Sequence, residues 1–133
     1  MTPMSLDRIA VVIVTYNSVG YLPDLFASLE TTACDRTWSV IVVDNASTDT
    51  TIPWLNTYAA TGTLRERLII IRNKENTGFA RGNNIGIENA LSDGSDGVVL
   101  LNQDTVVDLS WLSVLIAVAE SDPAIGAVQS RLM

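Results

Sequence analysis

Histidine is absent from the 133-residue sequence, and cysteine occurs once, at Cys34. A disulfide framework, a thiol–histidine pair and an imidazole metal site are therefore excluded. Basic residues are scarce too: eight Lys and Arg stand against fifteen Asp and Glu, which gives a net charge of −7. Because a generic nucleic-acid-binding protein needs a basic face for phosphates, we expect no nucleic-acid partner. A phosphorylated ligand would meet an acidic protein, which favours a bridging cation.

Long apolar runs are also lacking. No segment reaches the roughly 18 uninterrupted apolar residues of a membrane helix, and the apolar run at 9–14 is too short for a signal peptide. We therefore expect no membrane segment in this chain, and a single cysteine agrees best with a reducing cytoplasm. Hydrophobic residues make up 47% of the sequence, so we expect one domain, residues 1–133, with a substantial core.

Apolar, β-branched runs recur along the chain with helical patterns between them. Continuous runs of this kind are typical of strands buried on both faces of a sheet. The alternation predicts βαβ units in an α/β fold, with a mostly parallel sheet covered by helices on both faces. The strands are expected at 9–14, 39–44, 68–72 and 97–102, with a weaker fifth run at 125–130, and the helices at 21–32, 48–60 and 110–120, the last capped by Asp108.

Polar residues follow each of the four main strands, in the segments TYN (15–17), DNASTD (44–49), NKENTG (73–78) and NQDT (102–105). Ligands of parallel sheets bind beyond the carboxyl ends of the strands. Four polar strand ends on one edge therefore predict a binding site there. Tyr16, in the first of these segments, could stack on a nucleobase.

Asp44 ends the second expected strand and allows two interpretations. It could be a turn residue, with Ser47 or Thr48 capping the next helix, or an acceptor for a base N–H or a ribose hydroxyl. A nicotinamide-type Rossmann enzyme is disfavoured, since TYNSVG after the first strand lacks the G-x-G-x-x-G phosphate cradle. A phosphorylation-receiver domain is disfavoured because the same turn supplies no acid for its magnesium ion.

Asp104 follows the fourth expected strand. It is either a turn acid ahead of a helix or a ligand of a divalent cation, Mn²⁺ or Mg²⁺. Magnesium usually binds through one or two carboxylates together with substrate phosphate oxygens. In an acidic chain without histidine, this is the simplest way to hold a diphosphate. Asn102 could supply a further oxygen, directly or through water.

Gly78, Gly82 and Gly86 recur every fourth residue within NTGFARGNNIGIENAL, residues 76–91. Each glycine inside a helix costs about 1 kcal/mol relative to alanine. Because residues four apart share a helix face, we expect this face to allow close backbone approach to the sheet or to a ligand. A loop over 76–82 with a helix after it is the alternative. Gly78 would expose amides to an anion, with Arg81 one turn further.

Four stretches occur together in a fixed order: VVIVTYN, VIVVDNASTDTT, NTGFARGNNIGI and VVLLNQDT. Their order, spacing and strand placement resemble the family-2 glycosyltransferases with the GT-A fold, over roughly residues 9 to 131. The residues of these four stretches are most similar to those of bacterial enzymes of rhamnosyltransferase type, which build cell-surface polysaccharide. The resemblance implies transfer of a sugar from a nucleotide diphosphate sugar, such as dTDP-rhamnose or a UDP-sugar, to a glycan or lipid-linked acceptor.

The resemblance also implies roles for particular residues. The first strand end would cradle the nucleobase and ribose, Asp44 would recognise the base, and a segment after the third strand would lie along the donor. Asp104 would match the last acid of the metal-binding DXD motif, which reads Asn102-Gln103-Asp104 here and has no first acid. The residues expected to bind the donor and its cation are Thr15, Tyr16, Asn17, Asp44, Asn76, Gly78, Arg81, Asn83, Asn102 and Asp104.

Family members extend well beyond the length of this chain, and the resemblance places the acceptor site and the catalytic carboxylate base in their following half. We therefore expect the 133 residues to be a truncated GT-A domain that binds the donor and transfers poorly or not at all. The full-length protein would be cytoplasmic, or peripheral at the inner face of the membrane. Two alternatives stay open: a nucleotide-binding module without transfer activity, and a nucleotidyltransferase-like α/β protein.

Overall fold

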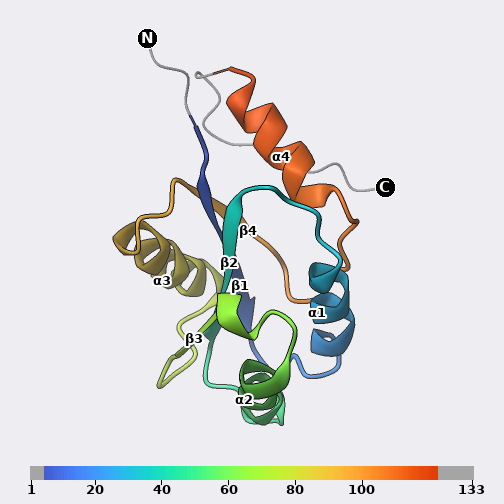
Figure 1. The fold of residues 1–133 in the computed structure, drawn as a ribbon. Helices are drawn as coiled ribbons and strands as arrows, with labels where there is room; N and C mark the ends of the chain where they lie inside the picture. The colour runs from blue at the N-terminus through green and yellow to red at the C-terminus, as the bar shows by residue number, and fades with distance from the viewer. Residues whose placement is uncertain (1–4, 123–133) are drawn as a thin grey trace.

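Four parallel strands form one sheet with helices on both of its faces in the computed structural model, which describes residues 5–122 (Figure 1). The strand order is β3-β2-β1-β4, and every neighbouring pair is parallel. This confirms the predicted α/β architecture. The elements are β1 (Arg8–Thr15), α1 (Leu22–Glu30), β2 (Thr37–Asp44), α2 (Thr51–Thr61), the short 3₁₀ helix η1 (Arg65–Arg67), β3 (Leu68–Arg72), α3 (Phe79–Ser92), β4 (Gly97–Leu100) and α4 (Trp111–Glu120).

Two apolar clusters, one on each face of the sheet, hold the helices in place. Alternate residues of β1 and β2 point to opposite faces, as the period of a strand requires. On one face, Val11 and Ile13 pack with α1, α2 and α4. On the other face, Val12 and Val14 pack with α3, through Ala90 and Ile85. Because β1 and β2 are covered on both faces, their runs are continuously apolar.

The observed element boundaries lie within a few residues of the predicted ones, but two capping predictions are wrong. Helix α4 begins at Trp111 with Ser110 at its N-cap, so Asp108 is not the capping residue. Helix α2 begins at Thr51 with Thr50 at its N-cap, so neither Ser47 nor Thr48 is the capping residue. Both of those residues bond to strand-end loops instead. The predicted run at 125–130 lies outside the described residues.

The glycines of residues 76–91 serve two different purposes. Helix α3 begins after Gly78, whose φ of 86° is a left-handed conformation that favours glycine. Gly82 and Gly86 lie inside the helix, where an added Cβ would come within 3.0 Å of Val14 and 2.3 Å of Val12. The predicted close approach to the sheet is therefore confirmed at these two positions. The alternative, a loop reaching residue 82, is wrong, because the loop ends at Gly78.

Candidate nucleotide-binding edge

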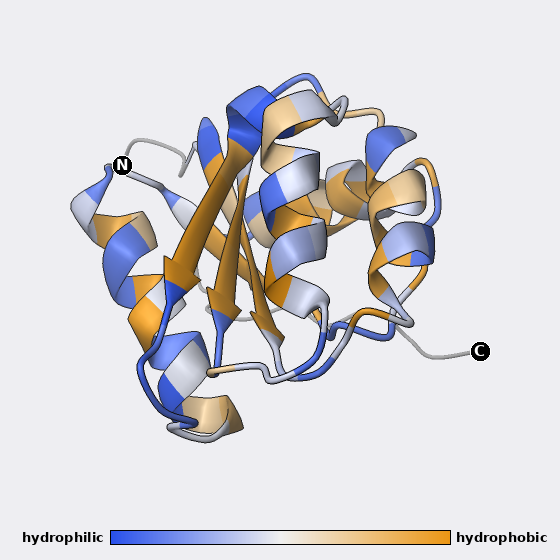
Figure 2. Ribbon diagram, turned by 90° about the horizontal axis from the view of Figure 1, so that it is seen from below, coloured by the Kyte–Doolittle hydropathy of each residue, from blue (hydrophilic) through white to orange (hydrophobic). Residues whose placement is uncertain are grey.

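The carboxyl ends of all four strands lie on one edge of the sheet, where polar loops replace the apolar strands (Figure 2). In chain order the sheet extends from β1 through β2 to β3, and β4 then pairs with the other side of β1. The sheet order therefore reverses between β1 and β4. Ligands of open α/β sheets bind at such a switch point. The loops after β1 and β4, at 15–17 and 102–105, meet at this point.

Asp44, the last residue of β2, is buried, with 1% of its surface exposed. Its Oδ1 accepts hydrogen bonds from the hydroxyls of Thr15, at 2.7 Å, and Ser47, at 2.6 Å. Its Oδ2 accepts a third bond from the Ser47 amide at 2.9 Å. A carboxylate has about four acceptor positions, so these three bonds leave one. Asp44 thus connects the end of β1 to the loop after β2. This agrees with its interpretation as a turn residue.

Asn17 joins the loop after β1 to the loop after β2. Its Oδ1 accepts hydrogen bonds from the amides of Thr48 and Asp49, at 2.8 and 3.2 Å. Its own amide donates to Oγ of Ser47 at 2.9 Å. The φ of Asn17 is 47°, in the left-handed region that asparagine tolerates better than most residues. In the loop after β2, a hydrogen bond with Thr51 holds the pKa of Asp49 below its usual value.

Asn45 joins β2 to the loop that precedes α3. Its side chain is buried, and its Nδ2 donates to the carbonyl of Gly78 at 3.1 Å. Its Oδ1 accepts from Nδ2 of Asn73 at 2.9 Å and from the hydroxyl and amide of Thr77 at 3.0 and 3.3 Å. One amide side chain therefore fixes residues 73–78 and the start of α3. The Asn76 side chain accepts from the Gly78 amide at 2.9 Å and tightens the same turn.

Gln103 joins the loop after β4 to the loop after β1. Its Oε1 accepts hydrogen bonds from the amide of Tyr16, at 3.1 Å, and from the hydroxyl of Ser18. Together with the contacts of Asn17 and Asn45, this bond connects all four strand-end loops. The four loops thus form one hydrogen-bonded surface at the carboxyl edge of the sheet.

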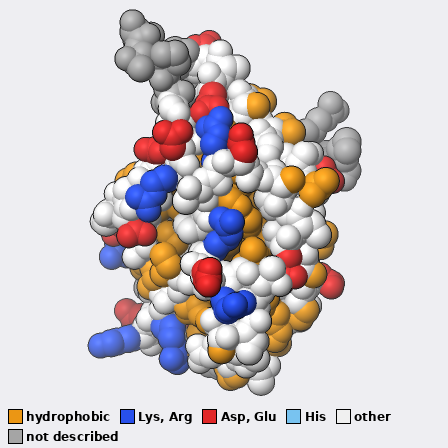
Figure 3. All heavy atoms as spheres, viewed as in Figure 1, with side chains coloured by type: hydrophobic (Ala, Val, Ile, Leu, Met, Phe, Trp, Pro, Cys, Tyr) orange, Lys and Arg blue, Asp and Glu red, His pale blue; other side chains and the backbone are white. Residues whose placement is uncertain are grey.

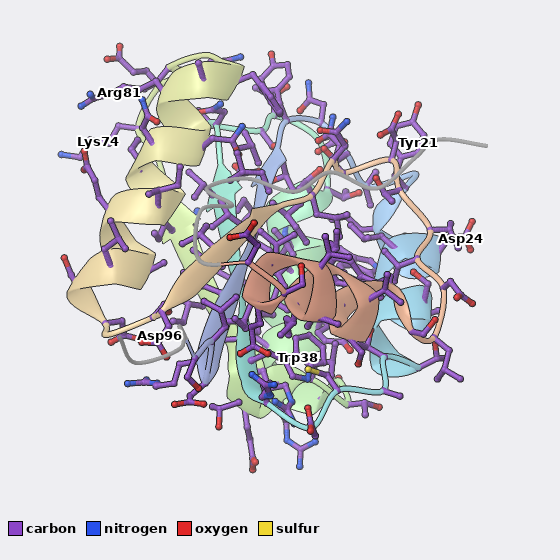
Figure 4. The ribbon with its side chains drawn as sticks, turned by 90° about the horizontal axis from the view of Figure 1, so that it is seen from above. Tyr21, Asp24, Trp38, Lys74, Arg81 and Asp96 are labelled. Carbon is purple, nitrogen blue, oxygen red and sulfur yellow. The ribbon has the colours of Figure 1, made fainter. Side chains whose placement is uncertain are left out.

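The predicted site residues divide into a buried and an exposed group. Thr15, Asp44 and Asn83 are buried and support the edge from beneath. The exposed group presents an aromatic ring, amides, a guanidinium and a carboxylate to solvent, and consists of Tyr16, Asn17, Asn76, Gly78, Arg81, Asn102 and Asp104. Figure 4 shows Arg81 and Asp96 at opposite ends of α3, so Arg81 lies at the end near the strand-end loops.

Sequence reasoning missed residues at this edge of two kinds. Arg72 at the end of β3 and Lys74 just after it are exposed cations. Figure 4 shows Lys74 and Arg81 at the same end of α3. Asn45 and Gln103 are the amides that tie the loops together. All four belong to or adjoin the polar segments already recognised, but Asn45 and Gln103 make their contacts across the sheet edge, and these contacts have no local sequence signal.

The loop of Asn102 and Asp104 offers oxygen ligands that suit a hard divalent cation. Asp104 is its one carboxylate, and both side chains are exposed. Residues 5–122 contain no group of three or more Asp, Glu, Cys or His side chains that could hold a metal ion. These residues therefore fit a cation that shares its coordination with substrate phosphates and water, rather than a cation enclosed by protein ligands.

Two further features of the surface are a cavity beside α2 and the distribution of charge. A cavity of about 380 Å³ runs along α2 and is lined partly by Trp54 and Tyr58. Acidic and basic side chains are interspersed on the face shown in Figure 3. In the described part of the chain, no helix is long and apolar enough to cross a membrane.

Comparison with known protein families gives a match to the model described as glycosyl transferase family 2, over residues 10–133. The chain belongs to this family. The uncharacterised glycosyltransferase YfnE of Bacillus subtilis (strain 168) is 38% identical over 86 residues, which cover 65% of this chain and 21% of that protein.

Solved structures show the same fold. S. aureus TarS 1–349 in complex with UDP-GlcNAc has a TM-score of 0.69 at 23% identity, covering 92% of this chain and 37% of that one. The mannosyltransferase PcManGT from Pyrobaculum calidifontis, in complex with GDP-Man and Mn²⁺, has a TM-score of 0.73 at 23% identity, covering 93% and 35%. The fold of the family-2 chain is thus GT-A-like. The chain spans about a fifth of its curated relative and about a third of these structures.

Proposed function

We propose that this family-2 chain binds a nucleotide diphosphate sugar at the carboxyl edge of its sheet and forms the donor-binding part of an inverting glycosyltransferase. The observation that carries the proposal is the single hydrogen-bonded surface formed by the four strand-end loops at the switch point between β1 and β4. Solved structures of the same fold in complex with UDP-GlcNAc and with GDP-Man and Mn²⁺ support this choice of ligand.

The proposed roles follow from exposure and chemistry. Tyr16 and Asn17 lie beside the base and ribose, because an exposed ring can stack on a base and both residues follow β1. Arg81 approaches the diphosphate, since a guanidinium binds phosphate oxygens in pairs. Thr15, Asp44 and Asn83 shape the surface from beneath, and the last acceptor position of Asp44 can receive a base N–H.

Asp104, with Asn102, is proposed to hold Mn²⁺ or Mg²⁺ together with the diphosphate. A cation bound there would neutralise charge on the leaving nucleotide diphosphate. The residues of this chain orient the donor so that an acceptor hydroxyl can approach the anomeric carbon from the opposite side. A carboxylate base that removes the proton of that hydroxyl is assigned to the remainder of the whole protein, since this chain spans about a third of its structural neighbours.

For the whole protein we propose a dTDP-rhamnose or UDP-sugar donor and a glycan or lipid-linked acceptor in cell-surface polysaccharide synthesis. Such an enzyme would work in the cytoplasm or at the inner face of the membrane. The second candidate is a nucleotide-binding module without transfer activity, which is favoured by the single carboxylate on the 102–105 loop. Membership of family 2 favours both over a nucleotidyltransferase-like protein.

Calorimetric titration with UDP, dTDP and GDP, each with and without Mn²⁺, tests the donor site. We expect one nucleotide to bind in a metal-dependent manner and this binding to be lost in Asp104→Ala. Metal-independent binding would remove Asp104 from the cation site, and binding of none of the three nucleotides would contradict the proposed function. Donor hydrolysis or sugar transfer by the chain would exclude the non-catalytic module.

A further inference from the structure

Gln103 lies between the two residues assigned to the cation, yet its side chain is turned to a different partner. Its Oε1 accepts from the Tyr16 amide at 3.1 Å and from the Ser18 hydroxyl. Gln103 is partly buried, whereas Asn102 and Asp104 on either side of it are exposed. The middle residue of this short loop is thus the one that attaches the loop to the rest of the edge.

The partner of Gln103 is itself firmly held. Ser18 is fully buried, and its amide donates to Oγ1 of Thr51, the first residue of α2, at 2.9 Å. Its hydroxyl also accepts from the Tyr16 amide at 2.9 Å. The attachment point of Gln103 is therefore anchored to the core through α2, and the loop after β4 gains this rigidity through a single side chain.

Among residues 5–122, no other side chain of the 102–105 loop makes a hydrogen bond. The loop does contain a backbone bond from the Thr105 amide to the Asn102 carbonyl, at 3.3 Å. Just before it, the Leu101 amide bonds to the Val12 carbonyl at 2.9 Å. On the far side of Asp104, the Val107 amide donates to Oγ of Ser28 at 3.0 Å. Between Leu101 and Val107, Gln103 is the residue whose side chain attaches the loop to the rest of the edge.

We propose that Gln103 is a positioning residue that couples the Asp104 loop to the Tyr16–Ser18 turn, so that cation-dependent nucleotide binding requires its acceptor oxygen. The proposal rests on the proposed donor site. Without the acceptor, the two halves of the site move independently, and the cation and the base are no longer held at a fixed separation. Loss of the Gln103 oxygen, which accepts from two donors, is expected to weaken the Mn²⁺-dependent nucleotide affinity about five- to tenfold. The affinity without metal should change little.

The first arm of the test needs no nucleotide. Amide NMR spectra of the 133-residue chain are compared for Gln103→Met, which keeps the side-chain length but has no carbonyl acceptor, and Gln103→Glu, which keeps an acceptor. Val106→Ala is the matched control, because Val106 follows the same loop and is 68% exposed. We expect Gln103→Met to shift the Tyr16 amide and speed its hydrogen exchange, and the other two variants to leave it close to wild type.

The second arm is calorimetric titration of the same variants with UDP, dTDP and GDP, with and without Mn²⁺. A Tyr16 amide that does not respond to Gln103→Met overturns the coupling, whatever the nucleotides do. A responding amide together with unchanged Mn²⁺-dependent affinity overturns the positioning role. If the wild-type chain binds none of these nucleotides, the proposed function fails and the positioning role fails with it, while the amide spectra still decide whether the two loops are coupled.

Discussion

Gly86→Ala is expected to destabilise the chain although it adds a better helix-forming residue. The new Cβ would lie 2.3 Å from Cγ1 of Val12, and 3.1 and 3.3 Å from two further atoms of that side chain. Val12 is fully buried in β1 and β-branched, so it has little freedom to rotate away. Overpacking of this kind costs about 1–3 kcal/mol, and the close contact places Gly86 in the upper part of that range. Helix propensity returns about 1 kcal/mol, which leaves a net loss of about 1–2 kcal/mol.

Denaturant unfolding of three variants on the same helix measures this balance. Gly82→Ala should lie closer to wild type, because its Cβ would meet Val14 and Asn45 at 3.0–3.2 Å, where small shifts suffice. Asn84→Ala is the control, since Asn84 is exposed and should gain only about half a kcal/mol from helix propensity. If Gly86→Ala is as stable as wild type or more stable, close packing against β1 is not the reason for this glycine.

Three further predictions concern stability. Glu120→Gln should weaken the fall in the free energy of unfolding at acid pH. Hydrogen bonds from Arg36 and the Leu6 amide lower the pKa of Glu120 from 4.5 to about 2, so its stabilising contribution is complete above pH 4.5 and is lost as the pH falls towards 2. A variant whose free energy of unfolding falls from pH 7 to 2 as steeply as that of wild type would contradict this. Asn45→Ala should cost about 2–4 kcal/mol in denaturant unfolding, because it leaves several partly buried polar groups without a partner. A loss below about 1 kcal/mol would refute its role as a connector. Gly78→Ala should cost about 1–3 kcal/mol in the same assay from backbone strain alone, since its φ of 86° and ψ of 166° are essentially restricted to glycine and nothing lies within 4 Å of its Cβ position. An unchanged stability would contradict a requirement for positive φ.

The fold was predictable because its signals are local or strictly periodic. β1 is a continuous run of buried residues from Ile9 to Thr15, and such a run has few alternatives to a central strand. The glycine spacing predicted a close approach of α3, although only the structure shows that β1 lies beneath Gly82 and Gly86. Helix starts were less predictable, since Asp108, Ser47 and Thr48 are good caps that the tertiary structure uses otherwise.

The sequence predicted where the candidate site would lie, but not the hydrogen bonds within it. The predicted parallel sheet brings the four polar strand ends to one edge, as the structure shows, and the rule that ligands bind at strand carboxyl ends makes this edge the candidate site. It could not show that Asp44 would be buried with three hydrogen bonds, or that Asn45 and Gln103 would join loops from different strands. The contacts of Asn45 with Asn73 and of Gln103 with Tyr16 link residues 28 and 87 positions apart in the chain, so no short motif encodes them.

An amide NMR titration of the chain with UDP, dTDP and GDP in the presence of Mg²⁺ tests the central claim most directly. The account predicts that one nucleotide shifts amides in all four strand-end loops, at 15–17, 44–49, 73–81 and 102–105, and leaves the amino ends of the strands unchanged. Shifts confined to another region, such as the cavity along α2 at Trp54 and Tyr58, would contradict the assignment of the nucleotide to this edge.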